Sequence, residues 1–325
     1  MEANQVNRLL IMDSSPQGRV VESTRRIMYT VSLTLVPALA VSVWIFGWDA
    51  LRVIVLSSLF CVATEALIAR FASYKIDYMD GSALLTGILL AMNLPANSPW
   101  WIIFIGSLVA IVIGKQVFGG LGQNIFNPAL VARVFLLISF PVELTSWPVP
   151  GQKVDAATGA TPLGILKTEG VGALADTNLA DLAMGNMGGS LGEISAIALL
   201  IGAAYMIYKR YITWEVPILF IGTVFVFAGI FWLIDPTQYA SPAFHVLTGS
   251  VFLGAFYMAT DMVSSPLTYK GKLIFGFGCG FFTIVIRLFG SYPEGVSFAI
   301  LLMNAMVPLL DKYLPDKKFG MVKNG

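Results

Sequence analysis

The chain has 325 residues, of which 57% are hydrophobic and only 12% are charged, and its 20 Lys and Arg residues nearly balance 19 Asp and Glu residues. A mean hydropathy of +0.78 is far too apolar for a soluble domain with a hydrated surface, so a polytopic membrane protein is predicted. We expect no nucleic-acid partner. The first 26 residues lack an apolar run long enough for a signal peptide, so the first span is expected to insert without cleavage.

Ten apolar runs come close to the roughly 20 residues that a helix needs to cross a hydrocarbon core of about 30 Å. They predict transmembrane segments near 27–47, 51–69, 81–95, 100–118, 125–141, 192–209, 215–234, 244–262, 272–291 and 295–313. The third and fifth runs are short and are interrupted by Gly or ended by Pro. The predicted fold class is an all-α polytopic membrane protein with about ten transmembrane helices.

The distribution of basic residues predicts the orientation. With the N-terminus in the cytoplasm, 15 of the 20 Lys and Arg residues, Lys115 among them, fall on cytoplasmic ends and loops, as the positive-inside rule requires. Both termini are then cytoplasmic, and a net acidic loop lies outside. The predicted regions are a cytoplasmic N-terminal segment (1–26), a first five-helix repeat (27–141), an extracytoplasmic loop (142–191), a second five-helix repeat (192–313) and a cytoplasmic tail (314–325).

An odd number of spans in each half requires that any internal repeat has inverted topology. The third span reads GSALLTGILLAMNLP from Gly81, and the eighth reads GSVFLGAFYMATDMVSSP from Gly249; each opens with Gly-Ser and ends at Pro after a polar break. Small residues recur in membrane helices for packing, so the similarity is weak by itself. Paired, interrupted short spans indicate a site near the middle of the membrane.

The first candidate site is GKQVFGGLGQNIFNPAL, from Gly114 to Leu130, between the fourth and fifth spans. Its glycines would let the backbone approach a ligand closely, and Asn127 followed by Pro128 is a strong helix start with Asn127 as the cap. The segment is either a tight interfacial turn with a cap or a ligand site, and its spacing does not decide between them.

Four ionisable residues lie inside spans or at their borders, namely Glu65, Arg133, Asp261 and Arg287. Charges in the membrane are costly unless they are paired or hydrated, so a functional role is the default hypothesis. Snorkelling to a headgroup would explain Arg287 and Glu65 equally well, and Asp261 could simply belong to the cytoplasmic end of its helix.

Cys61, Cys279 and His245 sit in apolar runs, where we expect them to pack between spans rather than to bind metal. They cannot supply the four thiolates of an iron–sulfur cluster or two histidines for a haem. An electron carrier on this chain would therefore be organic, or a partner would supply it.

The last candidate is DAATGAT, from Asp155 to Thr161 in the outer loop, directly before Pro162. Thr161 could be a helix cap with Pro162 in the first turn. Alternatively, it could carry a covalent group. Self-modification is not expected, because no histidine lies nearby in sequence to act as a base, but a separate transferase could install a phosphate ester where a helix N-terminus favours an anion. Local chemistry leaves both readings open.

Three stretches together resemble one family. DAATGAT resembles the Asp-x-x-Thr/Ser-Gly-Ala-Thr signature that flavin transferases recognise. The segment from Gly114 to Leu130 and the stretch MATDMVSSPLTYKGKLIFG, with SYPEGVSFAILLMNAMVPLLD behind it, resemble the membrane core shared by the RnfD and NqrB subunits of ion-translocating oxidoreductases. The resemblance runs from about Ser14 to Asp311, and the short N-terminal region favours the RnfD branch.

The resemblance implies FMN linked through its phosphate to Thr161, with Asp155, Thr158, Gly159 and Ala160 as the recognition sequence of a flavin transferase. The implied fold is two inverted repeats of five helices, similar to urea transporters. The implied partners are the flavin transferase, membrane lipid and the A, B, C, E and G subunits of an Rnf-type complex in the prokaryotic cytoplasmic (inner) membrane.

The resemblance further implies that Asn124 and Asn127 contact a second, non-covalent flavin such as riboflavin. No catalytic or metal-ligating residue is predicted on this chain.

The leading hypothesis is a flavin-carrying subunit of an enzyme complex that couples electron transfer of the ferredoxin:NAD type to Na⁺ or H⁺ transport, and the subunit is not expected to be active alone. A urea-type solute channel or transporter would explain the membrane architecture equally well, but it gives no reason for DAATGAT. A third hypothesis is a membrane scaffold whose outer loop docks partners.

Overall fold

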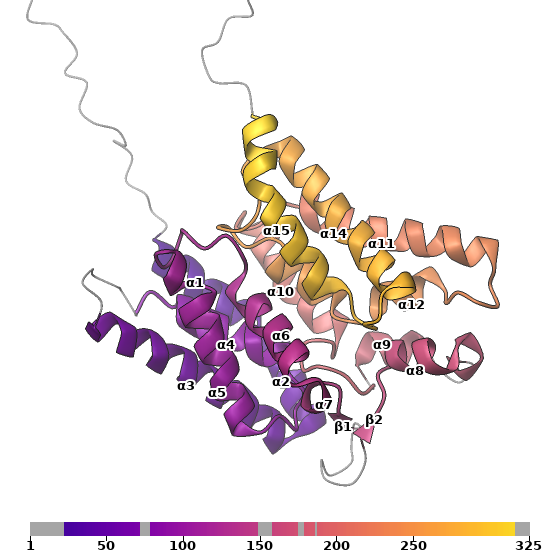
Figure 1. Cartoon of the computed structure of the whole chain (residues 1–325), viewed down its shortest axis with the longest axis horizontal. Coiled ribbons are helices and arrows are strands. Elements are labelled where there is room, and N and C mark those ends of the chain that lie inside the picture. The colour runs from indigo at the N-terminus through magenta and orange to yellow at the C-terminus, as the bar shows by residue number, and fades with distance from the viewer. Residues whose placement is uncertain (1–22, 72–78, 149–157, 175–178, 186, 316–325) are drawn as a thin grey trace, which may run out of the picture.

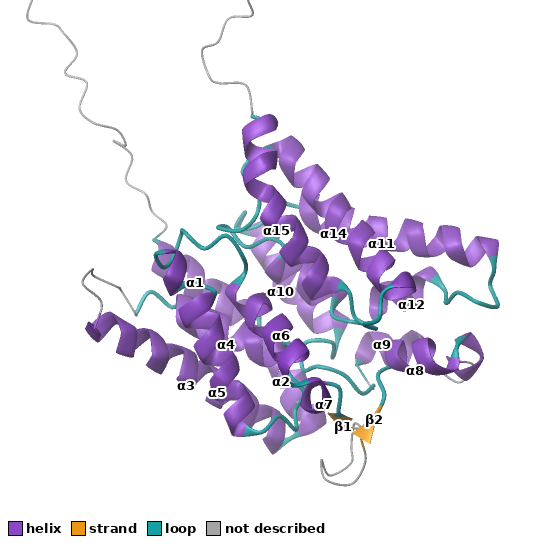
Figure 2. Cartoon of the chain, viewed as in Figure 1, coloured by secondary structure: helices purple, strands orange, loops and turns teal. Residues whose placement is uncertain are grey.

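The computed structural model describes residues 23–71, 79–148, 158–174, 179–185 and 187–315. Within these residues the chain is almost entirely helical, and Figure 2 shows one short pair of strands among the helices. β1 (Trp147–Pro148) and β2 (Thr158–Gly159) run antiparallel, with Trp147 opposite Gly159. The helical fold class predicted from composition is confirmed for the described part of the chain.

The helices follow one another in three groups. The first group is α1 (Thr24–Thr34), α2 (Val36–Phe46), α3 (Trp48–Phe71), α4 (Ser82–Met92), α5 (Trp100–Leu108), η2 (Val109–Ile113), η3 (Gln116–Phe118) and α6 (Pro128–Ser139). Short elements follow, namely α7 (Pro141–Leu144), α8 (Pro162–Glu169), η4 (Val171–Leu174) and α9 (Leu179–Met184). The last group is α10 (Ala196–Tyr208), α11 (Glu215–Ile234), α12 (Pro242–Leu247), α13 (Val251–Leu253), η5 (Gly254–Met258), α14 (Tyr269–Phe289) and α15 (Val296–Tyr313).

Among the described residues, six helical segments are long and apolar enough to cross a membrane. They are Thr24–Phe46, Trp48–Phe71, Trp100–Phe118, Glu215–Ile234, Tyr269–Phe289 and Val296–Tyr313. The other predicted spans contain shorter helices: α4, α6, α10 and the series α12, α13 and η5. The described part of the chain is therefore helical, with six candidate membrane spans.

Proline and glycine break the first predicted span and separate it from the second. α1 ends at Thr34 and α2 begins at Val36, with Pro37 in its first turn. Proline has no backbone N–H and clashes with the preceding turn, so a helix is interrupted or kinked there. Gly47, at φ 65°, then ends α2 one residue before α3 begins.

The third and eighth predicted spans, which contain α4 and η5, are both interrupted, and they meet in the interior. α4 ends at Met92, and Asn93 donates from its side chain to Leu89 O at 2.7 Å and to the Met258 sulfur at 3.7 Å. The backbone N–H of Gly192, just before α10, donates to Met92 O at 2.7 Å. Lipid offers no partners to irregular backbone, so burial against other protein segments is what permits these breaks at depth.

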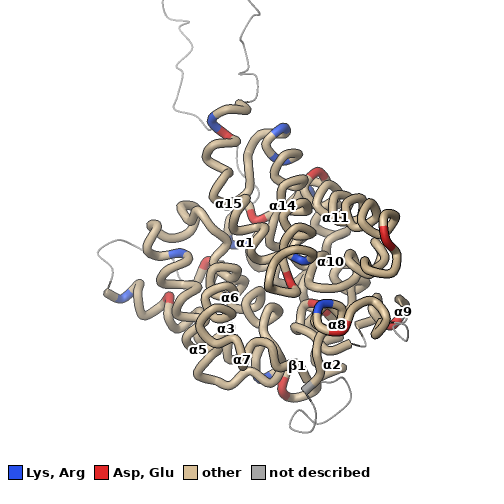
Figure 3. The backbone as a smooth tube through the Cα atoms, turned by 45° about the vertical axis from the view of Figure 1, so that its right-hand side comes forward, with Lys and Arg blue, Asp and Glu red and all other residues tan. Residues whose placement is uncertain are grey.

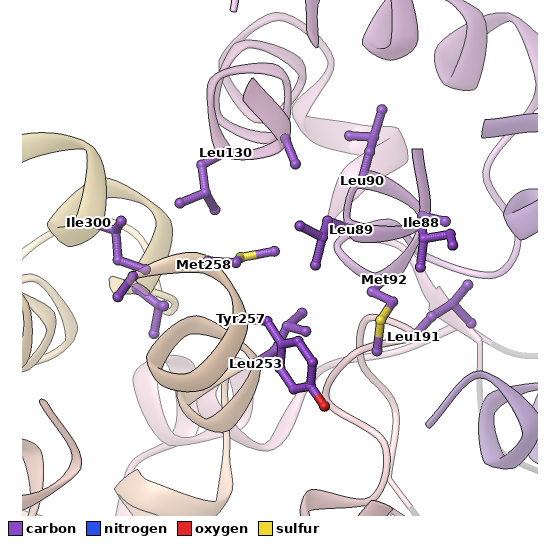
Figure 4. Packing of buried hydrophobic residues seen from close by; sticks show 14 of the residues in the cluster. Ile88, Leu89, Leu90, Met92, Leu130, Leu191, Leu253, Tyr257, Met258 and Ile300 are labelled. Atoms are coloured by element: carbon purple, nitrogen blue, oxygen red, sulfur yellow. The ribbon is translucent and has the colours of Figure 1, made fainter. Parts of the chain in front are cut away.

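Apolar side chains from both halves fill the space around this meeting point. Figure 4 shows Leu89 and Leu130 from the first half close to Met258 and Ile300 from the second, and all four are buried. This core ties the two halves of the chain together around the ends of the broken spans.

The arrangement in space separates the outer-loop elements from the chain ends. In Figure 1, β1, β2, α7, α8 and α9 lie in the lower part of the view, while α1 lies at the left near mid-height and the end of α15 lies at the top. Charged residues are sparse along the helices in Figure 3. Large apolar side chains such as Trp44, Ile218 and Leu233 are exposed on the long helices, as expected for surfaces that face lipid.

Gly202 in α10 tests the packing between the halves. A Cβ there would overlap Thr34 O and the Tyr257 hydroxyl, and Tyr257 donates to both Thr34 O and Leu199 O at 3.3 Å. Gly202→Ala should therefore destabilise the protein by roughly 1–3 kcal/mol, the usual cost of overpacking. The measurement is the thermal unfolding midpoint in detergent.

Gly222→Ala in α11 is the matched control, because its added Cβ would meet no atom within 4 Å. Equal unfolding midpoints for the two variants would contradict the packing described for α10.

Candidate functional site

A cleft lies between the start of α1, the first turns of α4, the glycine-rich segment before α6, and η5 with the turn after it. Its polar lining residues are Ser82, Thr86, Lys115, Asn124, Asn127, Thr260 and Asp261. Its apolar walls include Leu85, Leu89, Leu121, Ile212 and Phe256. The cleft thus combines apolar walls with a few convergent polar groups, which is the usual character of a small-molecule site.

Both asparagines predicted from the glycine-rich segment line this cleft. Asn127 caps α6, and its side-chain oxygen accepts from Ala129 N at 3.1 Å and from Leu130 N at 3.4 Å. Its amide nitrogen donates to Met258 O at 3.3 Å, so the cap is also tied to the second half. Asn124 donates to Phe126 O at 3.0 Å. The predicted cap is confirmed, and the predicted flavin contacts of the two asparagines stay a prediction.

The backbone before α6 uses glycine where other residues would be strained. Gly119, Gly120 and Gly122 have φ values of 113°, 94° and 91°, a region that L side chains rarely adopt. These turns bring Asn124 and Asn127 to the same cleft as Lys115.

The Lys115 side chain is a charged group of the cleft that sequence reasoning missed. The positive-inside rule places it at a cytoplasmic end, but it is only 2% exposed and donates to Glu65 Oε1 and to Ser82 Oγ, each at 2.5 Å. Glu65 is 1% exposed, so it pairs inside the protein rather than snorkelling. The two charges lie 50 residues apart in different spans, so the sequence shows two charges near span ends but does not show that they pair.

Asp261 follows η5 and lines the same cleft. Its carboxylate accepts from Ser264 Oγ at 2.9 Å. It lies just beyond the end of η5, which agrees with the alternative of a helix-end residue, and its place in the cleft wall leaves the functional alternative open.

Arg133 and Arg287 are buried away from the surface and do not snorkel. Arg133, in α6, pairs with Glu294 at 3.1 Å and lies 5.7 Å from the ring centre of Trp147. Arg287, near the end of α14, donates to Thr248 O at 2.9 Å, to Gly249 O at 3.0 Å and to the backbone carbonyl of His245. Both guanidinium groups therefore hold breaks and loops of the two halves in place.

Cys61, Cys279 and His245 are all buried, and the two thiols are free. Cys61 and Cys279 are packed inside candidate spans, as predicted, whereas His245 is buried in the short helix α12, outside the six candidate spans.

Thr161 caps α8, as one of its two readings predicted. Its hydroxyl accepts from Gly164 N at 3.0 Å, and Pro162 stands in the first turn. Thr161 is only 3% exposed.

The other residues of the DAATGAT motif precede the cap. Thr158 and Gly159 form β2 and Ala160 is exposed, while Asp155 lies outside the described residues. The first turn of α8 carries no acidic residue, so an anion there would meet no repulsion from its own helix.

Lys167 fastens α8 to the second half. From the last turn of α8 its ammonium donates to Arg287 O at 3.3 Å, to Tyr292 O at 3.1 Å and to Gly290 O. These carbonyls lie at and just beyond the C-terminus of α14, where a cation is favoured.

Comparison with known proteins assigns the chain to a family. A family model described as "NQR2, RnfD, RnfE family" matches residues 11–320. The chain belongs to this family. The resemblance noted from three separate stretches of sequence is thus confirmed.

The NQR2, RnfD, RnfE family member is similar to several named relatives over nearly its whole length. It is 45% identical to the D subunit of the proton-translocating ferredoxin:NAD(+) oxidoreductase complex of Clostridium ljungdahlii, with 98% of each chain covered. It is also 45% identical to the D subunit of the Na(+)-translocating ferredoxin:NAD(+) oxidoreductase complex of Acetobacterium woodii, again with 98% of each covered. The D subunit of an ion-translocating oxidoreductase complex from Escherichia coli is 36% identical, with 94% of this chain and 97% of the relative covered.

Lys167 gives a direct test of how this family member holds its α8 segment. Lys167→Met removes three charge-assisted bonds to the end of α14, and because the side chain is partly exposed the expected loss is about 1 kcal/mol of local stability. Hydrogen–deuterium exchange of α8 amides in detergent should become several-fold faster.

Lys209→Met is the control, because Lys209 is exposed at the end of α10 and far in sequence from α8. Unchanged exchange in α8 of the Lys167 variant would show that the segment is held by its apolar contacts alone.

Proposed function

We propose that this chain is the D subunit of a membrane complex that couples electron transfer of the ferredoxin:NAD type to ion transport. The observation that carries the proposal is identity of 45% across 98% of the chain to relatives of that name. The chain works as one subunit of an oxidoreductase and translocase, and its partners are the other subunits of that complex. Two equally similar relatives are named for different ions, H⁺ and Na⁺, so identity does not select the coupling ion.

The outer loop carries FMN as a phosphate ester on Thr161 in this proposal. The DAATGAT sequence, the cap position at the start of an eight-residue helix, and the absence of acidic residues from the first turn of α8 all support it. The N-terminus of α8 would hold the phosphate through its dipole and free N–H groups. Asp155, Thr158, Gly159 and Ala160 would be read by the transferase.

A second flavin, of the riboflavin type, binds in the cleft in the same proposal. The donor set supports this: Asn124, Asn127 and Lys115 offer N–H groups, and Ser82 and Thr86 offer hydroxyls. Leu85, Leu89 and Phe256 offer apolar surface for a ring system. The second flavin thus has both a polar edge and apolar walls to meet.

Bound flavin would supply electron exchange in steps of one or two electrons, and the chain would supply position, charge and exclusion of water. α8 and its Lys167 contacts fix the attachment point against the end of α14. The side chain of Asn127, at the start of α6, donates to Met258 O and so stabilises the position of α6 against η5 at the cleft. These residues hold carriers in place and take no part in bond making.

The proposed topology has ten membrane crossings in two inverted five-helix repeats, in the cytoplasmic (inner) membrane, with both termini in the cytoplasm. Six long spans, four shorter helical segments at the predicted places and the meeting of α4 with η5 support it. In this topology α8 faces outside and the turn after α10 faces the cytoplasm.

The attachment of FMN is tested by substituting Thr161 in protein made together with a competent flavin transferase. The wild type should show a flavin fluorescence band that survives denaturing electrophoresis, and Thr161→Val should lose the band completely, because it has no hydroxyl. Thr161→Ser keeps a hydroxyl and the cap, so it should keep part of the band and the stability of α8. A wild-type chain without a band, or a Thr161→Val chain with one, would show that this attachment site is wrong.

Orientation is tested with single cysteines. Glu169→Cys, at the end of α8, should react with a membrane-impermeant maleimide on intact cells, whereas Lys209→Cys should react only after permeabilisation. Native Cys61 and Cys279 are fully buried and provide a silent background. The reverse labelling pattern would overturn the proposed orientation.

A further inference from the structure

The Lys115–Glu65 pair is the most deeply buried ion pair among the described residues, and one of its charges lines the cleft. Lys115 is among the lining residues, whereas Glu65 stands behind it in α3. The positive member therefore faces the cleft and the negative member faces the protein interior. A ligand in the cleft would meet the positive end of this local dipole.

The contacts around Lys115 hold the ammonium at one place. An ammonium has three N–H groups. Glu65 Oε1 and Ser82 Oγ receive two of them, each at 2.5 Å. Ser82 is itself held by donating to Asp80 Oδ1 at 2.5 Å, and it also lines the cleft. One N–H remains for a group inside the cleft.

Glu65 pairs with Lys115 but does not line the cleft, so of the two charges only the positive one is presented to the cleft. Its Oε1 accepts from Lys115 and also from Gln116 Nε2 at 2.9 Å, while its Oε2 is buried with no hydrogen-bond partner. A buried pair costs desolvation that an apolar pair of the same volume would avoid, so it is weak evidence for a role in stability. A role for the charge itself explains its position better.

We propose that Lys115 is a positioning residue that sets the reduction potential of the flavin that would bind in the cleft, because its ammonium lines that cleft and would stabilise negative charge gained by the ring on reduction. The inference rests on the proposed second flavin. Uptake of two electrons and one proton by the isoalloxazine leaves one negative charge on its N1–C2=O edge. A fixed cation there stabilises the reduced form more than the oxidised form, which makes the potential more positive.

Because Lys115 and Glu65 carry opposite charges, removing one or the other should shift the flavin reduction potential in opposite directions. Removing the ammonium in Lys115→Met takes away the positive charge that lines the cleft, so the flavin potential should become more negative. Removing the carboxylate charge in Glu65→Gln leaves the ammonium without its counter-charge, so the potential should become more positive. A merely structural pair would give shifts of one sign or no shift at all.

The measurement uses the full-length chain with Thr161→Ala, which removes the covalent site, in lipid nanodiscs loaded with riboflavin. Riboflavin released on denaturation gives the occupancy, and titration with dithionite as the reductant, followed by absorbance, gives the midpoint potential. Lys115→Arg keeps the charge and should stay close to the parent. Lys209→Met removes an exposed lysine elsewhere and should leave the potential unchanged.

The outcomes separate this inference from the proposal beneath it. A parent chain that holds no riboflavin overturns the second flavin and this inference with it. A parent that holds riboflavin, with equal potentials in the parent and in Glu65→Gln, overturns only the role of Lys115. If Lys115→Met does not fold, Glu65→Gln is compared with Lys115→Arg. A positive shift of the midpoint potential in Glu65→Gln and no shift in Lys115→Arg support the role of Lys115. Any other pair of results overturns that role.

Discussion

The need to satisfy every backbone N–H and C=O group inside the membrane constrains this fold more than any other requirement. A span that stops partway across must end against protein. The chain meets this condition by bringing the end of α4 against η5, and by letting the backbone of Gly192 donate to Met92 O. The breaks are thus stabilised by segments that are distant in sequence.

The broken spans have a consequence for chemistry. Each break leaves polar groups and helix ends inside the protein, where water is scarce and charges act strongly. Near one break, Lys115, Asn124 and Asn127 gather around a cleft. Near the other, Arg287 binds the carbonyls of Thr248 and Gly249. A fold that interrupts its own helices therefore creates enclosed polar sites that unbroken spans would lack.

Features that depend on local sequence could be predicted, and features that depend on pairing between distant segments could not. Asn127 and Thr161 were predictable as caps because each is a capping residue directly before proline. Six candidate spans among the described residues followed from apolar length, whereas the other predicted spans contain shorter helices. The Lys115–Glu65 pair could not be read from either span alone, because it requires knowing that the end of α3 packs beside the segment after η2. For the same reason Arg133 was found by its charge, but its partner Glu294 was not.

The burial of Thr161 constrains when a flavin could be attached. Thr161 is only 3% exposed and its hydroxyl accepts a bond from Gly164 N, so the proposed transferase could not reach it with α8 docked as described. Leu163 packs where a side chain on Gly249 would stand, and Lys167 holds the end of the helix against α14. The proposed attachment of FMN to Thr161 would therefore have to precede this docking or to open it. The same contacts would then hold the modified loop against the second half, so α8 would be first the substrate of the proposed transferase and afterwards the segment that holds the proposed carrier in place.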